Sequence, residues 1–143
     1  MKTVIMAGGK GTRIASVASD IPKPMIPICG IPVLEREIEC LRSQGFTDII
    51  LTVSHMGEQI MQYFGDGSGI SPHTKKPFGV KISYYFEKEP LGNAGALFRL
   101  GEELIDGEED SFLLLNADSI FDVDFNRFVA AHKEYGGDVT LFT

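Results

Sequence analysis

Apolar runs and segments of helical periodicity alternate along most of this chain. Four short apolar runs have the length and composition of buried strands, at 2–6, 48–53, 80–86 and 111–118, and a further one begins at 138–143. Apolar residues recur at helical spacing between them, at 33–44, 57–64, 91–105 and 124–135. Because strands that alternate with helices pair in parallel, the pattern predicts an α/β fold with a doubly wound, mostly parallel sheet.

Proline and glycine mark the segments between these elements. Four prolines within 22–32 exclude a continuous helix and predict an extended segment that crosses the surface. The stretch 65–79 is long and irregular, so a lid over a ligand site and a disordered excursion are both open. Several large apolar side chains are expected in the core, namely Met56, Met61, Phe64 and Phe98.

The composition is that of a globular protein with an acidic balance. The chain has 143 residues, 20 acidic and 13 basic, and a formal net charge of −7. This length fits one domain, residues 1–143, and the charge argues against nonspecific nucleic-acid binding. The two cysteines form no metal or disulfide framework, and neither a signal-peptide core nor a membrane-length apolar window is present. We therefore expect a cytoplasmic protein without a membrane partner, and, because the chain stops on an apolar run, the N-terminal part of a longer one.

The loop after the first apolar run carries the first chemical signal. It reads Ala7-Gly8-Gly9-Lys10-Gly11-Thr12-Arg13. Glycines let backbone amides approach an anion closely, and the two cations add charge, so the loop predicts phosphate binding. It is not a Walker loop, because Gly11 follows Lys10, and not a dinucleotide fingerprint, because Ile14 replaces the third glycine. A strand-to-helix turn without a ligand is the alternative.

Two further residues place charge where a ligand can meet it. Lys23 lies between two prolines, which stiffen the backbone and fix where its ammonium group can meet a phosphate. Asp118 follows a strand at its carboxyl end, where ligand sites of open α/β sheets lie, and its carboxylate suits Mg²⁺. A connector lysine and a turn-capping aspartate are the alternatives. The glycines of 91–95 leave room for a flat group or for close helix–sheet packing.

Together these segments resemble the sugar-nucleotide pyrophosphorylases, also called sugar-1-phosphate nucleotidylyltransferases. The family pattern GGxGTR(L) followed by PKP(M/L)xP stands here at 8–13 and 22–27, LGNAGAL at 91–97 is close to LGTAGAL, and Asn116-Ala117-Asp118 matches a further motif. The similarity covers essentially the whole chain and is strongest to bacterial mannose-1-phosphate and heptose-1-phosphate guanylyltransferases. The segment 14–21 departs from the family and lacks its Arg-Pro pair. Family members are also longer, with a second metal-binding aspartate beyond residue 143.

The resemblance implies a fold, a reaction and a set of roles. The fold is a Rossmann-like nucleotidyltransferase fold, and the reaction transfers a nucleoside monophosphate from an NTP to a sugar-1-phosphate, with release of pyrophosphate. The loop from Ala7 through Gly8, Gly9, Lys10 and Gly11 to Thr12 would cradle the triphosphate. Arg13 would neutralise the β- and γ-phosphates, Lys23 would contact the α-phosphate or the acceptor phosphate, and Asp118 would hold Mg²⁺. A homo-oligomer and a fused C-terminal phosphatase domain, as in some relatives, are left open.

The resemblance also places Glu87 at the border of the base pocket, which Gly92 and Asn93 would complete. A carboxylate accepts two hydrogen bonds side by side. Guanine offers such a pair from N1–H and N2–H₂, whereas adenine, uracil and thymine do not, so GTP is favoured. A solvent-facing Glu87 is the alternative.

Two other functions remain open on the sequence alone. The chain could be a noncatalytic nucleotide-binding module that acts in regulation or assembly, although the intact Arg13, Lys23 and Asp118 favour an enzyme. It could also be a cytidylyltransferase or a molybdenum-cofactor guanylyltransferase, which share the glycine-rich loop. The PKPM and LGNAGAL segments favour the sugar-nucleotide branch.

Overall fold

The computed structural model describes residues 1–8, 20–54, 56–87, 92–104 and 111–142. In chain order its elements are β1 (Thr3–Met6), the 3₁₀ turn η1 (Lys23–Met25), β2 (Pro27–Ile28), β3 (Ile31–Pro32), α1 (Val33–Ser43), β4 (Asp48–Val53), α2 (Gly57–Phe64), β5 (Lys81–Phe86), α3 (Gly92–Leu104), β6 (Leu113–Asn116) and α4 (Phe125–Tyr135). None of the helices in these ranges has the length and apolar character needed to cross a membrane.

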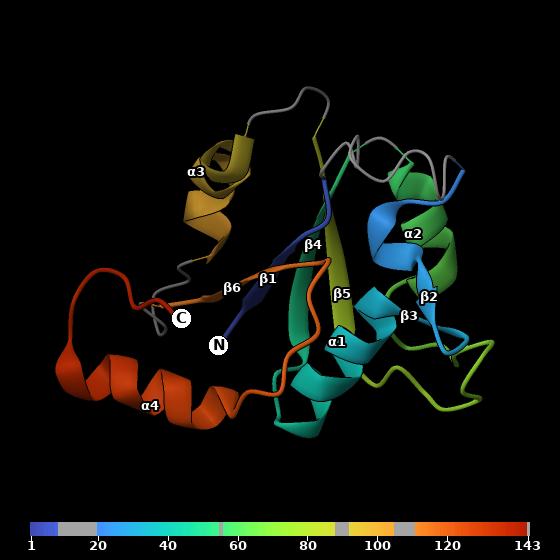
Figure 1. Cartoon of the computed structure of the whole chain (residues 1–143). Helices are drawn as coiled ribbons and strands as arrows, with labels where there is room; N and C mark the ends of the chain where they lie inside the picture. The colour runs from blue at the N-terminus through green and yellow to red at the C-terminus, as the bar shows by residue number, and fades with distance from the viewer. Residues whose placement is uncertain (9–19, 55, 88–91, 105–110, 143) are drawn as a thin grey trace.

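A four-stranded sheet forms the centre of the fold, with the strand order β5-β4-β1-β6 (Figure 1). Every neighbouring pair is parallel, as the alternation of strands and helices predicts. The register sets Val4 of β1 opposite Ile50 of β4 and Leu114 of β6. All four strands therefore end at the same edge of the sheet, which is where ligand sites of this architecture lie.

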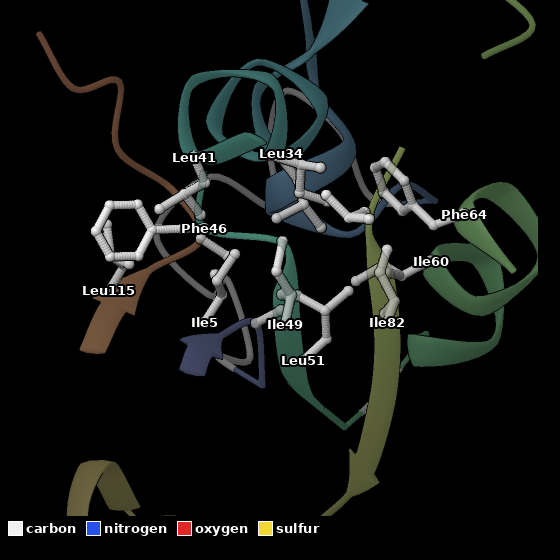
Figure 2. Packing of buried hydrophobic residues seen from close by; sticks show 14 of the residues in the cluster. Ile5, Leu34, Leu41, Phe46, Ile49, Leu51, Ile60, Phe64, Ile82 and Leu115 are labelled. Atoms are coloured by element: carbon white, nitrogen blue, oxygen red, sulfur yellow. The ribbon is translucent and has the colours of Figure 1, made fainter. Parts of the chain in front are cut away.

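Helices cover both faces of the sheet, so the doubly wound class is confirmed (Figure 1). On the face of α1 and α2, strand and helix side chains form one large apolar cluster that includes Ile5, Leu34, Leu41, Ile49, Leu51, Ile60, Phe64 and Ile82 (Figure 2). Strand side chains alternate in direction, so the opposite face carries a second cluster. It joins Val4 and Ile50 to Leu100 and Leu104 of α3.

The helices begin and end where their sequences specify. Residues 34, 38 and 41 of α1 are fully buried, as the periodicity predicts. Gly45 follows α1 with a φ of +91°, a conformation that glycine adopts without strain. At the start of α4, the Asp124 side chain accepts a hydrogen bond of 2.9 Å from the backbone N–H of Arg127 and caps the helix.

The proline-rich segment differs from the predicted extended crossing of the surface. It folds into η1 and then into a two-residue antiparallel hairpin of β2 and β3. The fixed φ of proline is compatible with the start of a helical turn, so Pro22 and Pro24 are accommodated in and next to η1. Pro24 is buried, which anchors the turn.

The irregular stretch 65–79 is neither a lid over the site nor disordered. Because it connects α2 to the start of β5, it lies at the amino edge of the sheet, opposite to the strand ends that would form a site (Figure 1). A bridge pairs Ile70 with Pro77, and the buried Ser71 accepts hydrogen bonds from the backbone of His73 and Thr74.

Three further expectations from the sequence are wrong. Met61 and Phe98 were expected in the core, but their side chains are 39% and 89% exposed. Strand β6 is not buried on both faces, because it lies at the edge of the sheet and Leu114 is 40% exposed. Residues 138–142 form no strand, since no sheet strand among the described residues pairs with them.

Candidate functional site

Four residues follow the four parallel strands at the carboxyl edge of the sheet. Gly8 follows β1, Ser54 follows β4, Glu87 follows β5 and Asp118 follows β6. Three of the four were predicted from the sequence, whereas Ser54 was missed. The parallel register brings these positions to the same edge although they are far apart along the chain.

Backbone hydrogen bonds extend the sheet just past the ends of its strands. The amide of Ala7 donates to the carbonyl of Thr52 at 2.9 Å, and the amide of Glu87 donates to the carbonyl of Val53 at 2.8 Å. The amide of Ala117 likewise donates to the carbonyl of Met6, at 3.1 Å. The residues that begin the site are thus held on the rigid sheet.

Gly8 is packed between two polar side chains. The Ser54 hydroxyl donates a hydrogen bond to the Gly8 carbonyl oxygen, which fixes the start of the glycine-rich loop to the end of β4. On the other side, a Cβ atom placed on Gly8 would lie only 2.9 Å from Oε1 of Glu87. The Glu87 carboxylate therefore occupies the space beside Gly8, and any larger residue at position 8 would displace it.

Lys23 and Asp118 form an ion pair across 95 residues of sequence, with the Lys23 ammonium donating to Oδ2 of Asp118. Their side chains are 37% and 39% exposed, so solvent reaches both groups. The sequence singled out each of them separately, and the structure brings them together. Their proposed roles toward phosphate and metal stay predictions.

The backbone that carries Lys23 is held firmly. Within the turn η1, the amide of Met25 donates to the carbonyl of Pro22 at 2.8 Å. The amide of Val33 at the start of α1 donates to the carbonyl of Ile26 at 3.2 Å, which ties the segment to the helix. These bonds fix the backbone from which the Lys23 side chain extends.

Glu37 is a second carboxyl group near Asp118, and it was not predicted. It is 2% exposed, and among the described residues neither of its oxygens has a hydrogen-bond partner. Burial, and to a lesser degree the charge of Asp118, raises the pKa of Glu37 to about 9, so this carboxyl is protonated at neutral pH. A signal existed in the sequence, because position 37 lies three residues after Leu34 and four before Leu41, on the apolar face of α1.

Several predicted site residues lie outside the described residues. They are Gly9, Lys10, Gly11, Thr12 and Arg13 of the glycine-rich loop. Gly92 and Asn93 form the start of α3, but the side chain of Asn93 is outside the description. The predictions for these residues are therefore not tested by the structure.

The described residues contain no group of three or more His, Cys, Asp or Glu side chains that could hold a metal ion. Asp118 offers a single half-exposed carboxylate. Mg²⁺ commonly keeps several waters and binds proteins through one or two carboxylates together with substrate phosphates. One carboxylate at this position therefore fits Mg²⁺ held jointly with a ligand, but not a metal held by protein alone.

The sheet and the residues at its edge define an open α/β protein, a class in which ligand sites lie at the carboxyl ends of the strands. Comparison with known protein families makes this class specific. The family described as "Nucleotidyl transferase" matches residues 2–143, and the chain belongs to this family.

Individual relatives agree with the resemblance to sugar-nucleotide pyrophosphorylases. The chain is 40% identical over 152 residues to a UTP–glucose-1-phosphate uridylyltransferase from Synechocystis sp., which covers 100% of this chain and 37% of that protein. It is 40% identical over 127 residues to a D-glycero-alpha-D-manno-heptose 1-phosphate guanylyltransferase from Campylobacter jejuni, covering 89% of this chain and 52% of that protein.

A solved structure confirms the fold. HddC from Yersinia pseudotuberculosis, complexed with GMP-PN, superimposes with a TM-score of 0.73 at 34% identity and covers 92% of this chain and 53% of that chain. The chain thus spans 37% to 53% of the length of these three proteins.

Proposed function

We propose that this chain carries the nucleotide-binding part of a sugar-1-phosphate nucleotidylyltransferase. Such an enzyme transfers a nucleoside monophosphate from an NTP to a sugar-1-phosphate and releases pyrophosphate. The observation that carries the proposal is the placement of Lys23 and Asp118 side by side at the carboxyl edge of the sheet, where Gly8 also begins its loop. The names of the two relatives above support it. A homo-oligomer and a fused phosphatase domain stay predictions of the sequence resemblance.

The proposed reaction needs charge and position more than a nucleophilic side chain. A phosphate oxygen of the sugar-1-phosphate attacks the α-phosphorus of the NTP, so two anionic groups must approach one another. The Lys23 ammonium reduces their repulsion, and the loop amides with Arg13 hold the departing pyrophosphate. Asp118 holds Mg²⁺, which supplies further positive charge to the phosphates when bound.

The base preference is a finer part of the proposal. Glu87 directs its carboxylate against Gly8, at the start of the phosphate loop, which supports a place for the base beside this pair. Two side-by-side acceptor oxygens match N1–H and N2–H₂ of guanine. We therefore propose GTP, although the named relatives include both a uridylyltransferase and a guanylyltransferase.

Thermal unfolding with GTP, UTP, dTTP, CTP and ATP, each with and without Mg²⁺, tests nucleotide binding. A ligand present at 100 times its Kd stabilises the folded state by about 2.7 kcal/mol, which is a shift of several degrees for a chain of this size. We expect the largest shift with GTP and Mg²⁺. A pyrimidine-selective shift would contradict the guanine assignment alone, and no shift with any nucleotide would contradict the proposed function. Pyrophosphate release with added sugar-1-phosphates separates an enzyme from a noncatalytic module.

Glu87→Gln tests the base assignment directly. The amide presents one acceptor and one donor side by side, which no longer matches guanine but matches O4 and N3–H of uracil. We expect the preference for GTP over UTP to fall roughly tenfold or more in competition binding, the scale of one lost bidentate contact. Glu134→Gln, which removes the same charge on the exposed end of α4, is the matched control and is expected to keep the wild-type preference. Equal effects of the two variants would refute the assignment.

A further inference from the structure

The ion pair joins two groups that are assigned to ligands of opposite charge. In the proposed function Asp118 binds a cation and Lys23 binds a phosphate. In the structure the ammonium of Lys23 instead donates to the carboxylate of Asp118. Within the described residues neither side chain has another ion-pair partner. The Lys23 ammonium therefore occupies the position that a cation bound to Asp118 would need. The Asp118 carboxylate occupies the position that a phosphate bound to Lys23 would need.

The pair is suited to being opened. Both side chains are more than one-third exposed, and ion pairs with this exposure are weak because water and salt screen them. The backbone on both sides is fixed, since η1 is anchored on α1 and Ala117 is hydrogen-bonded to β1. The long side chain of lysine has rotatable bonds along its whole length, so it can leave Asp118 without any movement of the fold.

We propose that the Lys23–Asp118 pair is a closed state of the site, in which Lys23 keeps a divalent cation away from Asp118 and Asp118 keeps a phosphate away from Lys23. This inference rests on the proposed function and adds the way in which its two ligands depend on each other. A ligand that opens the pair frees the partner group for the second ligand. Cation and phosphate therefore bind with positive coupling that comes from the protein, in addition to their direct attraction.

The first test measures the divalent cation alone. Mn²⁺ is titrated against the protein without nucleotide, and binding is followed by the loss of the free Mn²⁺ signal in electron paramagnetic resonance. Lys23→Met removes the competing ammonium and keeps a long side chain, so it is expected to bind Mn²⁺ roughly threefold to fivefold more tightly than wild type. Lys23→Arg retains the charge and is expected to bind no more tightly than wild type.

Lys76→Met is the matched control for the first test. It removes a cation that lies 3.8 Å from Glu39, at the amino edge of the sheet and away from the site. We expect Mn²⁺ affinity to stay at the wild-type value. An increase as large as that of Lys23→Met would show a general charge effect and overturn the proposal.

The second test measures the anion alone. Pyrophosphate is titrated by calorimetry in the presence of EDTA. Asp118→Asn removes the carboxylate that competes with pyrophosphate for Lys23. We therefore expect this variant to bind pyrophosphate roughly threefold to fivefold more tightly than wild type, although it has lost the proposed metal ligand. Asp122→Asn removes the same charge four residues further on and is expected to have a clearly smaller effect.

The two titrations separate this inference from the proposed function. Circular dichroism first checks that each variant is folded. If the two site variants bind their ions no more tightly than wild type, the closed state is refuted, and this includes the case in which no protein binds measurably. The absence of any stabilisation of wild type by nucleotides would instead refute the proposed function.

Discussion

Two buried carboxyl groups on one helix are held in opposite ways. Glu35 of α1 is 4% exposed and accepts hydrogen bonds from the Tyr63 hydroxyl at 2.6 Å and the Thr74 hydroxyl at 3.1 Å. Glu37 is 2% exposed and accepts no hydrogen bond from any residue that the structure describes. A buried polar group without a partner costs stability. Glu35 therefore joins neighbouring segments. Glu37 makes folding less favourable at any pH at which its carboxyl is ionised in the unfolded chain, because the folded protein must take the proton up again.

The Glu37→Gln variant is expected to change how stability depends on pH. The pKa of Glu37 is raised from its ordinary value of 4.5 to about 9 in the folded protein. Between these values the unfolded chain binds fewer protons than the folded one, so wild-type stability falls as the pH rises. Denaturant unfolding should show the wild type losing up to about 4 kcal/mol more than Glu37→Gln between about pH 5 and pH 8.

Glu39→Gln is the control for this experiment, because Glu39 lies on the same helix with an exposed side chain next to Lys76. Its pH profile is expected to follow that of the wild type. Parallel profiles for wild type and Glu37→Gln would show that the buried carboxyl is ionised at neutral pH.

Single residues could be predicted from the sequence where their chemistry does not depend on a distant partner. The glycine at position 8 and the lysine between two prolines were recognised from local pattern alone. The contact of Lys23 with Asp118 could not be, because it depends on η1 lying beside the end of β6, and the two residues are 95 positions apart. The burial of Glu37 was missed although its place on the apolar face of α1 indicated it, but the nearness of Asp118, 81 residues further along the chain, could not be read from that pattern.

At the scale of elements, the loop 65–79 is a fixed part of the structure. Tyr63 of α2 stacks on His73 of the loop with ring centroids 5.9 Å apart, and Thr74 reaches Glu35 on α1. Burial and the hydrogen bond to Glu35 raise the pKa of Tyr63 to about 12, so its hydroxyl remains a donor at neutral pH. One buried carboxylate thus joins two helices and a loop.

Tyr63→Phe is expected to loosen this junction. The change removes one donor from a buried carboxylate and should lower the free energy of unfolding by roughly 1–3 kcal/mol. Limited proteolysis within 65–79 should become faster. Tyr84→Phe is the control, because the Tyr84 hydroxyl donates at 2.6 Å to the carbonyl of Gly65 at an exposed site. A loss for Tyr84→Phe as large as that for Tyr63→Phe would contradict the role of Glu35.

Elements were predictable where the apolar pattern is long and regular. Strand β4 reads DIILTV and helix α1 repeats apolar residues every three to four positions, and both are found within a residue or two of the expected bounds. The pattern failed for 138–142, because an apolar segment becomes a strand only when another strand pairs with it. The pattern also failed for Phe98, since helical spacing does not show how much of the helix surface neighbouring elements cover.

Among the residues that the structure describes, buried apolar side chains form one large and one small cluster. Among the described side chains, 18 buried residues form the cluster under α1 and α2, and four form the cluster under α3. The described side chains therefore pack the two faces of the sheet unequally. Helix α3, whose first residues were predicted to border the base, rests on the smaller cluster.

This inequality predicts a gradient of local stability. Leu41→Ala in the large cluster should cost about 3–5 kcal/mol, whereas Leu100→Ala in the small one should lie near 2 kcal/mol. Hydrogen exchange should show the amides of α3 exchanging before those of α1. Equal costs together with equal exchange rates would contradict the picture of two unequal cores.

The central place of β1 in the sheet also has a consequence for folding during synthesis. Thr3 pairs with Ile49 and with Leu113, so β1 lies between two strands that are made after it, one of them more than 100 residues further along the sequence. Contacts this distant in sequence form late in folding. Gly8 after β1 and Asp118 after β6 therefore reach the same edge of the sheet only once β6 has been made, and nucleotide binding that needs both begins after that point.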